Sequence, residues 1–240
     1  MCGLSQELYN AIRKDAVPLE VTVEDRPYTT QNIHPVKEPE PGMLEVQTLT
    51  GFIDFVKTNI DNLQKGKTFI HVVNHEGVLL RSALHGPFLQ RDVIIRAVAK
   101  VPIRFNFGSY YDSESFNIAL QANFLPTEDR DLMLRYVGNI QDSNVKTIND
   151  DGISQEITTK TGIATVENVR LPNPVLLRPY RTFNEIEQPA SLFVFRAKRS
   201  SSDAPGFALY EADNKAWESV AMQSVKAYLA EALPDIHIIA

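Results

Sequence analysis

The sequence predicts an α+β fold, in which antiparallel sheets built from runs of hairpin strands pack against three to four helices behind an extended N-terminal arm. Strand-like segments follow one another in runs and do not alternate one by one with helices, which favours antiparallel sheets over a doubly wound parallel sheet. Several other segments carry apolar residues at helical spacing. We expect an arm over residues 1–45 and a globular domain over residues 46–240, which could divide near residue 140.

The composition is that of an ordinary globular protein. Of the 240 residues, 43% are hydrophobic and 22% are charged, with a net charge of −6, which argues against non-specific DNA binding by the whole surface. No apolar run is long enough for a transmembrane helix, and the N-terminus lacks the basic start and apolar core of a signal peptide. A single cysteine excludes an internal disulfide and fits a reducing cytoplasm.

The arm combines prolines with an excess of acidic residues. It holds five of the 14 prolines and a net charge of −4. "PLEVTV" alternates enough to add to a sheet as an edge strand, and the rest is expected to be extended, because proline fixes φ and removes a backbone donor. An arm of this kind either stays in solvent or wraps a neighbouring subunit, and we expect a homo-oligomer.

The globular part begins with a helix in "TLTGFIDFVKTNIDNL", where apolar residues lie on one helical face from Leu49 to Leu63 and Thr48 is a suitable N-cap. Two strands, "KTFIHVVN" and "GVLLRSAL", follow around the turn "HE", and "DVIIRAVAK" is a third strand. Asp112 is the expected N-cap of a helix in "YDSESFNIALQANF". A further helix, "LPTEDRDLMLRYVGNI", starts at Pro126 and ends near Gly138.

From residue 144 onward the pattern has period two. "NVKTIN" and "ISQEITTK" flank an acidic turn, which we interpret as a hairpin bend at Asn149–Gly152 because the adjacent Asp150 and Asp151 lack the alternating ligand spacing of a calcium loop. Further strands are expected in "IATVENV", "VLLRPY", "TFNEI", "SLFVFRAK" and "GFALYEA". A last helix follows Asp213 as N-cap, with Trp217 on its core-facing stripe.

Two other patterns could carry chemistry. If Met1 is removed, Cys2 would join a free amine to its thiol, as in the N-terminal nucleophiles of class II glutamine amidotransferases. The following residues look helical, however, where those enzymes have a buried strand. His71 and His75 are about 13 Å apart on an extended strand, too far for one zinc ion. We expect neither a metal nor a cofactor, and we keep a Cys2 amidohydrolase as an alternative function.

The segments "EDRDLMLRYVGNIQDSNVKTINDDGISQEITTKTGIATVENV", "PNPVLLRPYRTFNEIEQPASLFVFR" and "ALYEADNKAWESVAM" resemble a family of bacteriophage and prophage proteins whose function is not established. The resemblance covers about residues 48–232. It implies a phage product that acts in the host cytoplasm, and it implies no catalytic or binding residues. A structural component of the phage particle is a further alternative.

The strongest candidate for ligand contacts is "LLRPYRTF". Residues 170–199 carry six basic and two acidic residues, a balance of +4 in an otherwise acidic chain. Arg178 and Arg181 flank Tyr180, and arginine forks beside an aromatic ring commonly hold phosphates and stack on bases. The alternative is that both arginines form ion pairs with Glu185, Glu187 or acidic residues of a neighbouring subunit. The sequence therefore predicts a non-enzymatic binding protein that acts on a nucleic acid, a nucleotide signal or a host defence protein.

Overall fold

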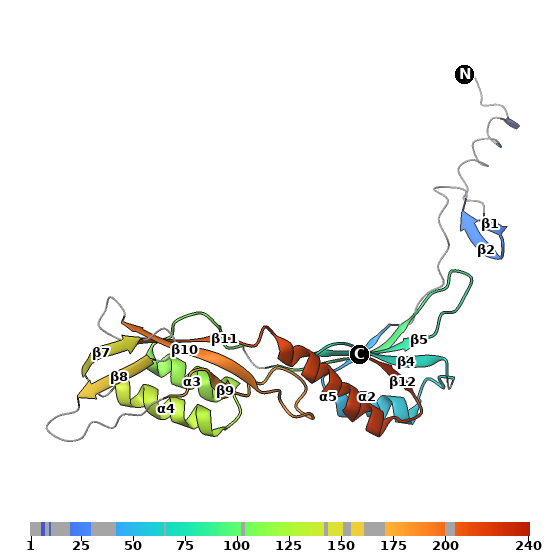
Figure 1. Ribbon diagram of the computed structural model, residues 1–240. Helices are drawn as coiled ribbons and strands as arrows, with labels where there is room; N and C mark the ends of the chain where they lie inside the picture. The colour runs from blue at the N-terminus through green and yellow to red at the C-terminus, as the bar shows by residue number, and fades with distance from the viewer. Residues whose placement is uncertain are drawn as a thin grey trace, which may run out of the picture.

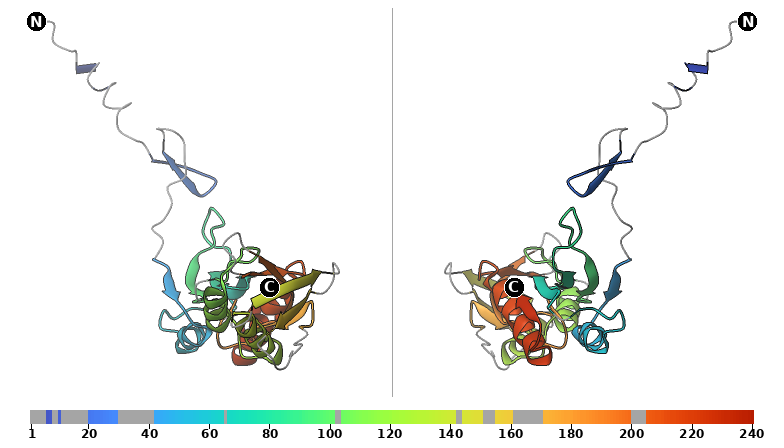
Figure 2. Two further views of the ribbon diagram at one scale, coloured as in Figure 1. Left: turned by 90° about the vertical axis from the view of Figure 1, so that its left-hand side faces the viewer. Right: turned by 90° about the vertical axis from the view of Figure 1, so that its right-hand side faces the viewer.

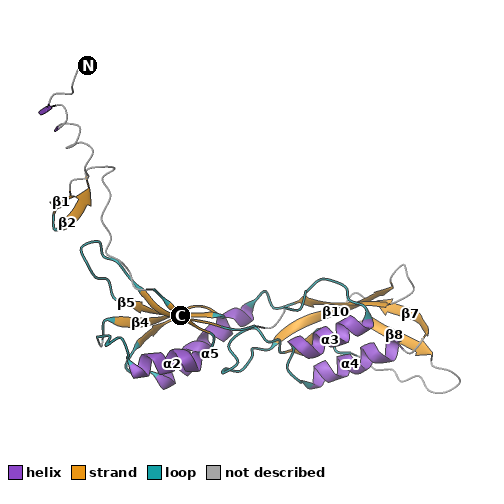
Figure 3. Cartoon of the chain, turned by 180° about the vertical axis from the view of Figure 1, so that it is seen from behind, coloured by secondary structure: helices purple, strands orange, loops and turns teal. Residues whose placement is uncertain are grey.

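The computed structural model describes residues 6–7, 10, 20–29, 42–64, 66–101, 104–141, 144–150, 155–160, 171–199 and 205–240. Within these ranges the α+β class is confirmed, with antiparallel and mixed sheets. Two lobes lie side by side, each with its own sheet, helices and apolar core (Figures 1 and 3). None of the described helices combines the length and the apolar character needed to cross a bilayer.

The first lobe, residues 42–98 and 216–240, is built on a five-stranded mixed sheet. Its order is β12 (His237–Ile239), β4 (Thr68–Asn74), β5 (Gly77–Ser82), β6 (Val93–Val98) and β3 (Leu44–Val46). The three central strands are antiparallel, as predicted, whereas both edge strands pair in parallel. Helices α2 (Leu49–Thr58) and α5 (Ala216–Ala232) cover one face of this sheet, and alternate strand residues such as Ile70 and Leu80 pack beneath them.

The second lobe, residues 105–177 and 191–211, is inserted between the two parts of the first. Its antiparallel sheet has the order β11 (Pro205–Glu211), β10 (Ser191–Arg199), β9 (Val175–Leu177). Helices α3 (Ser113–Asn123) and α4 (Glu128–Gln141) pack against it around a core dominated by phenylalanines (Phe105, Phe116, Phe124, Phe193, Phe195 and Phe207). The expected division near residue 140 falls at the end of α4, inside this lobe.

Two hairpins complete the description. β7 (Asn144–Asp150) pairs with β8 (Gln155–Lys160), so the predicted hairpin is confirmed. The bend predicted at Asn149–Gly152 needs correction, because Asn149 and Asp150 pair with β8 as part of strand β7; residues 151–154 lie outside the described residues, as does "IATVENV". β1 (Glu20–Val23) pairs with β2 (Arg26–Thr29). The described part of "PLEVTV", residues 20–23, therefore belongs to a hairpin of its own and does not add to the main sheet as an edge strand. Figures 1 and 2 show this hairpin clear of both lobes.

Two of the three predicted N-caps are confirmed. The Thr48 Oγ1 accepts a hydrogen bond from the Gly51 amide, and Asp112 accepts from the Ser115 amide. For α5 the prediction was wrong. The N-cap is Lys215, in the left-handed region at φ 60°, and it makes no side-chain cap bond. Asp213 instead accepts from the Lys215 amide, so it stabilises the turn before the helix.

Helix α4 has Gly138 near its end, as expected. Two further expectations need correction. Helix α2 ends at Thr58, because Asn59 adopts a left-handed C-cap, and Ile60 beyond it is 68% exposed instead of continuing the apolar face. The "TFNEI" segment is a turn and not a strand, because the side chain of Gln188 bonds to its backbone and closes it. Its Phe183 and Ile186 enter the core of the first lobe.

Candidate functional site

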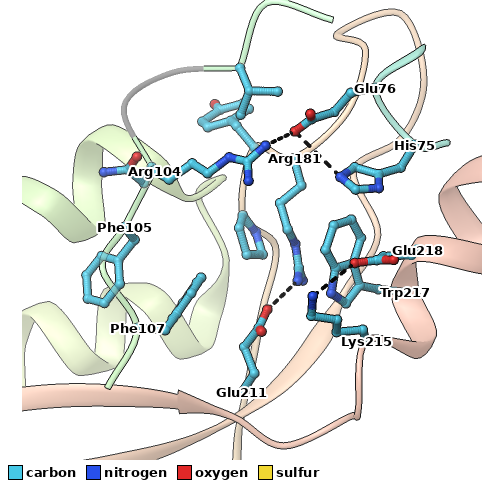
Figure 4. Close-up of a pocket in the computed structure, with 14 residues that line it drawn as sticks. His75, Glu76, Arg104, Phe105, Phe107, Arg181, Glu211, Lys215, Trp217 and Glu218 are labelled. Carbon is cyan, nitrogen blue, oxygen red and sulfur yellow. Dashed lines mark hydrogen bonds and ion pairs between the residues drawn. The ribbon is translucent and has the colours of Figure 1, made fainter. Parts of the chain in front are cut away.

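A cavity of about 170 Å³ lies at the junction of the two lobes (Figure 4). Its walls come from four places far apart in sequence: the β4–β5 turn, the connection after β6, the segment that follows β9, and the turn that leads into α5. Rings contribute much of the lining, from His75, Phe105, Phe107, Tyr180 and Trp217. Junctions between packed units are a common location for ligand pockets.

Arg181 is the central charged group of this cavity. It is buried, at 7% exposure. Its Nη1 lies 3.0 Å from Glu211 Oε1 and its Nη2 donates to Ser191 Oγ at 2.5 Å. The guanidinium carbon lies 3.9 Å from the centre of the Trp217 ring, a cation–π contact. Burial lowers the pKa of Arg181 to about 10, against the opposing effect of nearby carboxylates, so the group stays charged at neutral pH.

His75 lies on the other side of the tryptophan. Its ring centroid is 4.6 Å from that of Trp217, in an edge-on arrangement. Burial lowers the pKa of His75, although Glu76 and Glu218 act to raise it. The imidazole is therefore neutral at pH 7, with one ring nitrogen able to donate and the other to accept. The backbone fixes its place, because the His75 carbonyl accepts a hydrogen bond from the Thr182 hydroxyl.

Two exposed cations lie at the rim of the cavity. Arg104 pairs with Glu76 and its side chain is 71% exposed. Lys215 Nζ lies 3.7 Å from Glu218 Oε1, and its side chain is 68% exposed. Pairs this exposed contribute little to stability, about 0–1 kcal/mol, so either cation can exchange its carboxylate for another anion at low cost.

Two buried donors in the wall of the cavity have no hydrogen-bond partner among the described residues. They are the Nε of Arg181 and the Nε1 of Trp217, and both belong to residues that are 7% exposed. An unpartnered buried donor costs roughly 1–3 kcal/mol, and such groups tend to mark functional sites or ordered water. Both atoms lie within the wall, so a molecule carrying acceptor atoms would satisfy them once the side chains of Arg181 and Trp217 turn toward it.

The three predicted ligand contacts are only partly brought together. Tyr180 and Arg181 line the cavity, whereas Arg178 points elsewhere and pairs with Glu187 at the surface. Arg178 thus forms one of the ion pairs that the alternative interpretation names, whereas Arg181 pairs with Glu211 on β11, which it does not name. Pro179 forms an isolated antiparallel bridge with Phe124, and the amides of Leu125 and Tyr180 donate to the carbonyls of Arg178 and Asn123, so the segment is held at the C-terminal end of α3. Anion binding by Arg178 and Arg181 remains a hypothesis.

The other candidate residues do not form a site within the described ranges. Cys2 lies outside them. No group of three or more His, Cys, Asp or Glu in the described part of the chain is placed to hold a metal ion. His85 makes a separate contact, with its Nε2 2.7 Å from Asp92 Oδ2, at the loop between β5 and β6.

Sequence reasoning missed most of this cavity. His75 and Glu76 were assigned to a turn, and Trp217 was assigned to the core of the last helix. Trp217 is indeed buried, but it also forms part of the wall of the cavity. A lone tryptophan and a lone histidine at a turn, more than 140 positions apart, carry no local signal of proximity. They meet because α5 returns to the first lobe after the second and packs on β4.

Comparisons of the chain with models of known protein families, with curated proteins and with solved structures find no significant match. The cavity must therefore be interpreted from its own residues.

Proposed function

We propose that this chain is a non-enzymatic binding protein and that the junction cavity holds the base of a nucleotide. The observation that carries the proposal is the combination of a ring-lined cavity with two buried donors that lack partners, Arg181 Nε and Trp217 Nε1. Nucleobases carry ring nitrogens and carbonyl oxygens that accept hydrogen bonds at the edge of a flat apolar surface. Both properties match the cavity wall.

The size of the cavity supports a single ring system. Its volume is about 170 Å³, and a protein cavity of roughly 150 Å³ accommodates one benzene-sized molecule. A base would occupy this space between the rings of Tyr180 and Trp217, while sugar and phosphate would extend toward solvent. A folded oligonucleotide is too large for the cavity itself.

The exposed cations at the rim of the cavity support a ligand that carries a negative charge. Arg104 and Lys215 are each held only by a weak surface pair, and neither is needed inside the cavity. We therefore assign phosphate contact to these two residues. Arg181 has a different role, because its guanidinium is engaged by Glu211 and Ser191, and it forms part of the wall against which the base packs.

The wider setting is also a proposal. The resemblance to bacteriophage and prophage proteins supports a phage product that acts in the host cytoplasm, where a nucleotide signal or a strand of nucleic acid would be the source of the base. Three alternatives stay predictions: binding of a host protein, an enzyme that uses Cys2, and a structural component of the phage particle. None of them involves the residues that line the cavity.

The test is thermal unfolding in the presence of ligands at low salt. The panel holds the four ribonucleoside monophosphates, their nucleosides, a cyclic dinucleotide, a single-stranded DNA oligonucleotide and inorganic phosphate. A ligand at 100 times its Kd adds about 2.7 kcal/mol to stability, which corresponds to a rise in Tm of roughly 5–10 °C. We expect such a rise with at least one nucleotide and none with phosphate alone.

Variants locate the site. Arg104→Ala and Lys215→Ala should each reduce the shift given by the nucleotide while leaving that of the matching nucleoside unchanged. Lys57→Ala, on the exposed surface of α2 and away from the cavity, is the matched control and should change neither. Absence of any shift across the panel with the unmutated protein would contradict the proposal.

A further inference from the structure

One face of the five-stranded sheet has no described helix over it. Helices α2 and α5 both pack on the side of Ile70 and Leu80 (Figure 1). The strand register places a different set on the other side, in two rows across the sheet. One row is Ile239, His71, Leu79, Arg96 and Glu45, and the other contains His237, Phe69 and Arg81. We call these eight residues the open face.

The open face is basic and partly apolar. Phe69 and Ile239 belong to neither core cluster of the described residues, and Ile239 is 39% exposed, whereas Leu79 is buried at 9% exposure. Arg81 and Arg96 lie among them, and Arg91, outside the set of eight, places its guanidinium 4.8 Å from the centre of the Phe69 ring. Glu45 is the one acidic residue of the eight. Two arginines against one carboxylate, with Arg91 beside them, make a surface suited to an acidic partner.

The β1–β2 hairpin has the complementary character. Its register places Val21, Val23 and Tyr28 on one face, with Arg26 opposite Val23 on that face, and the two valines are 39% and 53% exposed. Residues 20–29 contain Glu20, Glu24 and Asp25 against Arg26 alone, a balance of −2. An isolated two-stranded hairpin is marginally stable in water, so a hairpin this short needs a surface to pack on.

We propose that the β1–β2 hairpin of one copy docks on the open face of a second copy, in a reciprocal exchange that forms a symmetric dimer. Valines would cover the apolar positions and the acidic tip would meet the arginines. The hairpin lies clear of both lobes of its own chain (Figures 1 and 2), so the open face of a second copy is the surface to which we assign it. Reciprocal contacts of this type close a two-fold dimer.

Aliphatic residues favour a protein partner over nucleic acid on this face. Single-stranded nucleic acid is held by stacking on exposed aromatic rings. Phe69 is the single phenylalanine, tyrosine or tryptophan among the eight, beside the imidazoles of His71 and His237, and Arg91 lies over it. The proposed docking is independent of the nucleotide cavity, which lies at the junction of the two lobes and is lined by none of the eight residues of the open face.

The experiment is complementation between two full-length variants, with mass measured by light scattering. The first variant carries Val21→Asp and Val23→Asp in the hairpin, and the second carries Arg81→Glu and Arg96→Glu on the open face. Each alone should be a monomer. Mixed together they should form dimers, because the intact hairpin of one still meets the intact face of the other.

Control and contrary outcomes are distinct. Ile118→Asp, on an exposed position of α3, should leave the unmutated dimer intact. If both variants lose thermal stability without a change of mass, the hairpin docks within its own chain and the exchange is wrong. A monomeric unmutated protein, or a labelled single-stranded oligonucleotide whose binding is lost in the Arg81→Glu, Arg96→Glu variant, would also overturn the proposal.

Discussion

Arg178 and Arg181 lie three residues apart and should differ sharply in their contribution to stability. Replacing Arg181 with methionine keeps most of the side-chain volume but removes the guanidinium that bonds to Glu211 and Ser191. It also removes the cation–π contact with Trp217 at 3.9 Å. The same replacement at Arg178 removes only the surface pair with Glu187.

The magnitudes follow from burial. Breaking a buried ion pair by removing one partner costs about 3–5 kcal/mol, because the other charge is left uncompensated. The Glu211 side chain is 26% exposed, so water recovers part of that cost and we expect roughly 2–4 kcal/mol for Arg181→Met. For Arg178→Met, whose partner Glu187 is 74% exposed, we expect at most about 1 kcal/mol.

Urea unfolding followed by circular dichroism measures the free energy of unfolding of both variants. In thermal unfolding, the expected loss for Arg181→Met corresponds to a fall in Tm of about 5–15 °C, and that for Arg178→Met to a fall of less than about 4 °C. Equal effects at the two positions would refute the assignment of Arg181 to the structural wall of the cavity. A stabilised Arg181→Met would show that its burial costs more free energy than its contacts return.

Two further predictions concern a helix cap and a histidine. Asp112→Ala should destabilise the protein by about 1 kcal/mol because it removes the bonds between the α3 cap and Ser115. Asp213 caps no helix, so Asp213→Ala should cost under about 0.5 kcal/mol. Equal losses of the free energy of unfolding in urea would contradict this difference. The pKa of His75 is lowered in the folded protein by burial. The unfolded state therefore binds a proton first, and the stability that His75 contributes is complete above its ordinary pKa and lost as pH falls through the lowered value. Unfolding midpoints should consequently fall between pH 7 and pH 5 less steeply in His75→Gln than in the unmutated protein, and identical slopes would show that His75 does not titrate in this way.

Local signals were sufficient for much of the fold. The spacing of Leu49, Phe52 and Ile53 behind Thr48, and of Phe116 and Leu120 behind Asp112, identifies two helices because the cap and the apolar face agree. The pairing of β4 with β5 follows from the short turn at His75 and Glu76, whereas β6 comes after a longer loop, residues 83–92, and is identified by its own apolar pattern. The hairpin of β7 and β8 follows from period two on both sides of turn residues.

Long-range pairing was beyond sequence reasoning. The strands β3 and β12 have three residues each and come from opposite ends of the globular part, so neither carries a pattern that identifies it. Their parallel pairing depends on the completed central sheet. Lys215 as N-cap was also unpredictable, because its left-handed backbone is imposed by the turn between the lobes and not by its side chain.

The candidate site divides in the same way. The segment with Tyr180 and Arg181 was identified from its charge and ring, and both residues line the cavity. Arg178 was grouped with them for its charge and for its position beside the ring of Tyr180. Extended chain alone places Arg178 and Arg181 on opposite faces, and in the structure they form separate ion pairs, with Glu187 and Glu211. The opposite wall, His75 and Trp217, depends on the packing of α5 on β4, which no local pattern in the sequence indicates.

The most direct test of the binding proposal uses Trp217, the single tryptophan of the chain, which lines the cavity against Arg181 and His75. Its emission should change in a saturable way on titration with the nucleotide that gives the largest thermal shift, and the change should weaken in Arg104→Ala but persist in Lys57→Ala. A nucleotide that stabilises the protein while leaving the emission of Trp217 unchanged would place binding elsewhere and contradict the proposal.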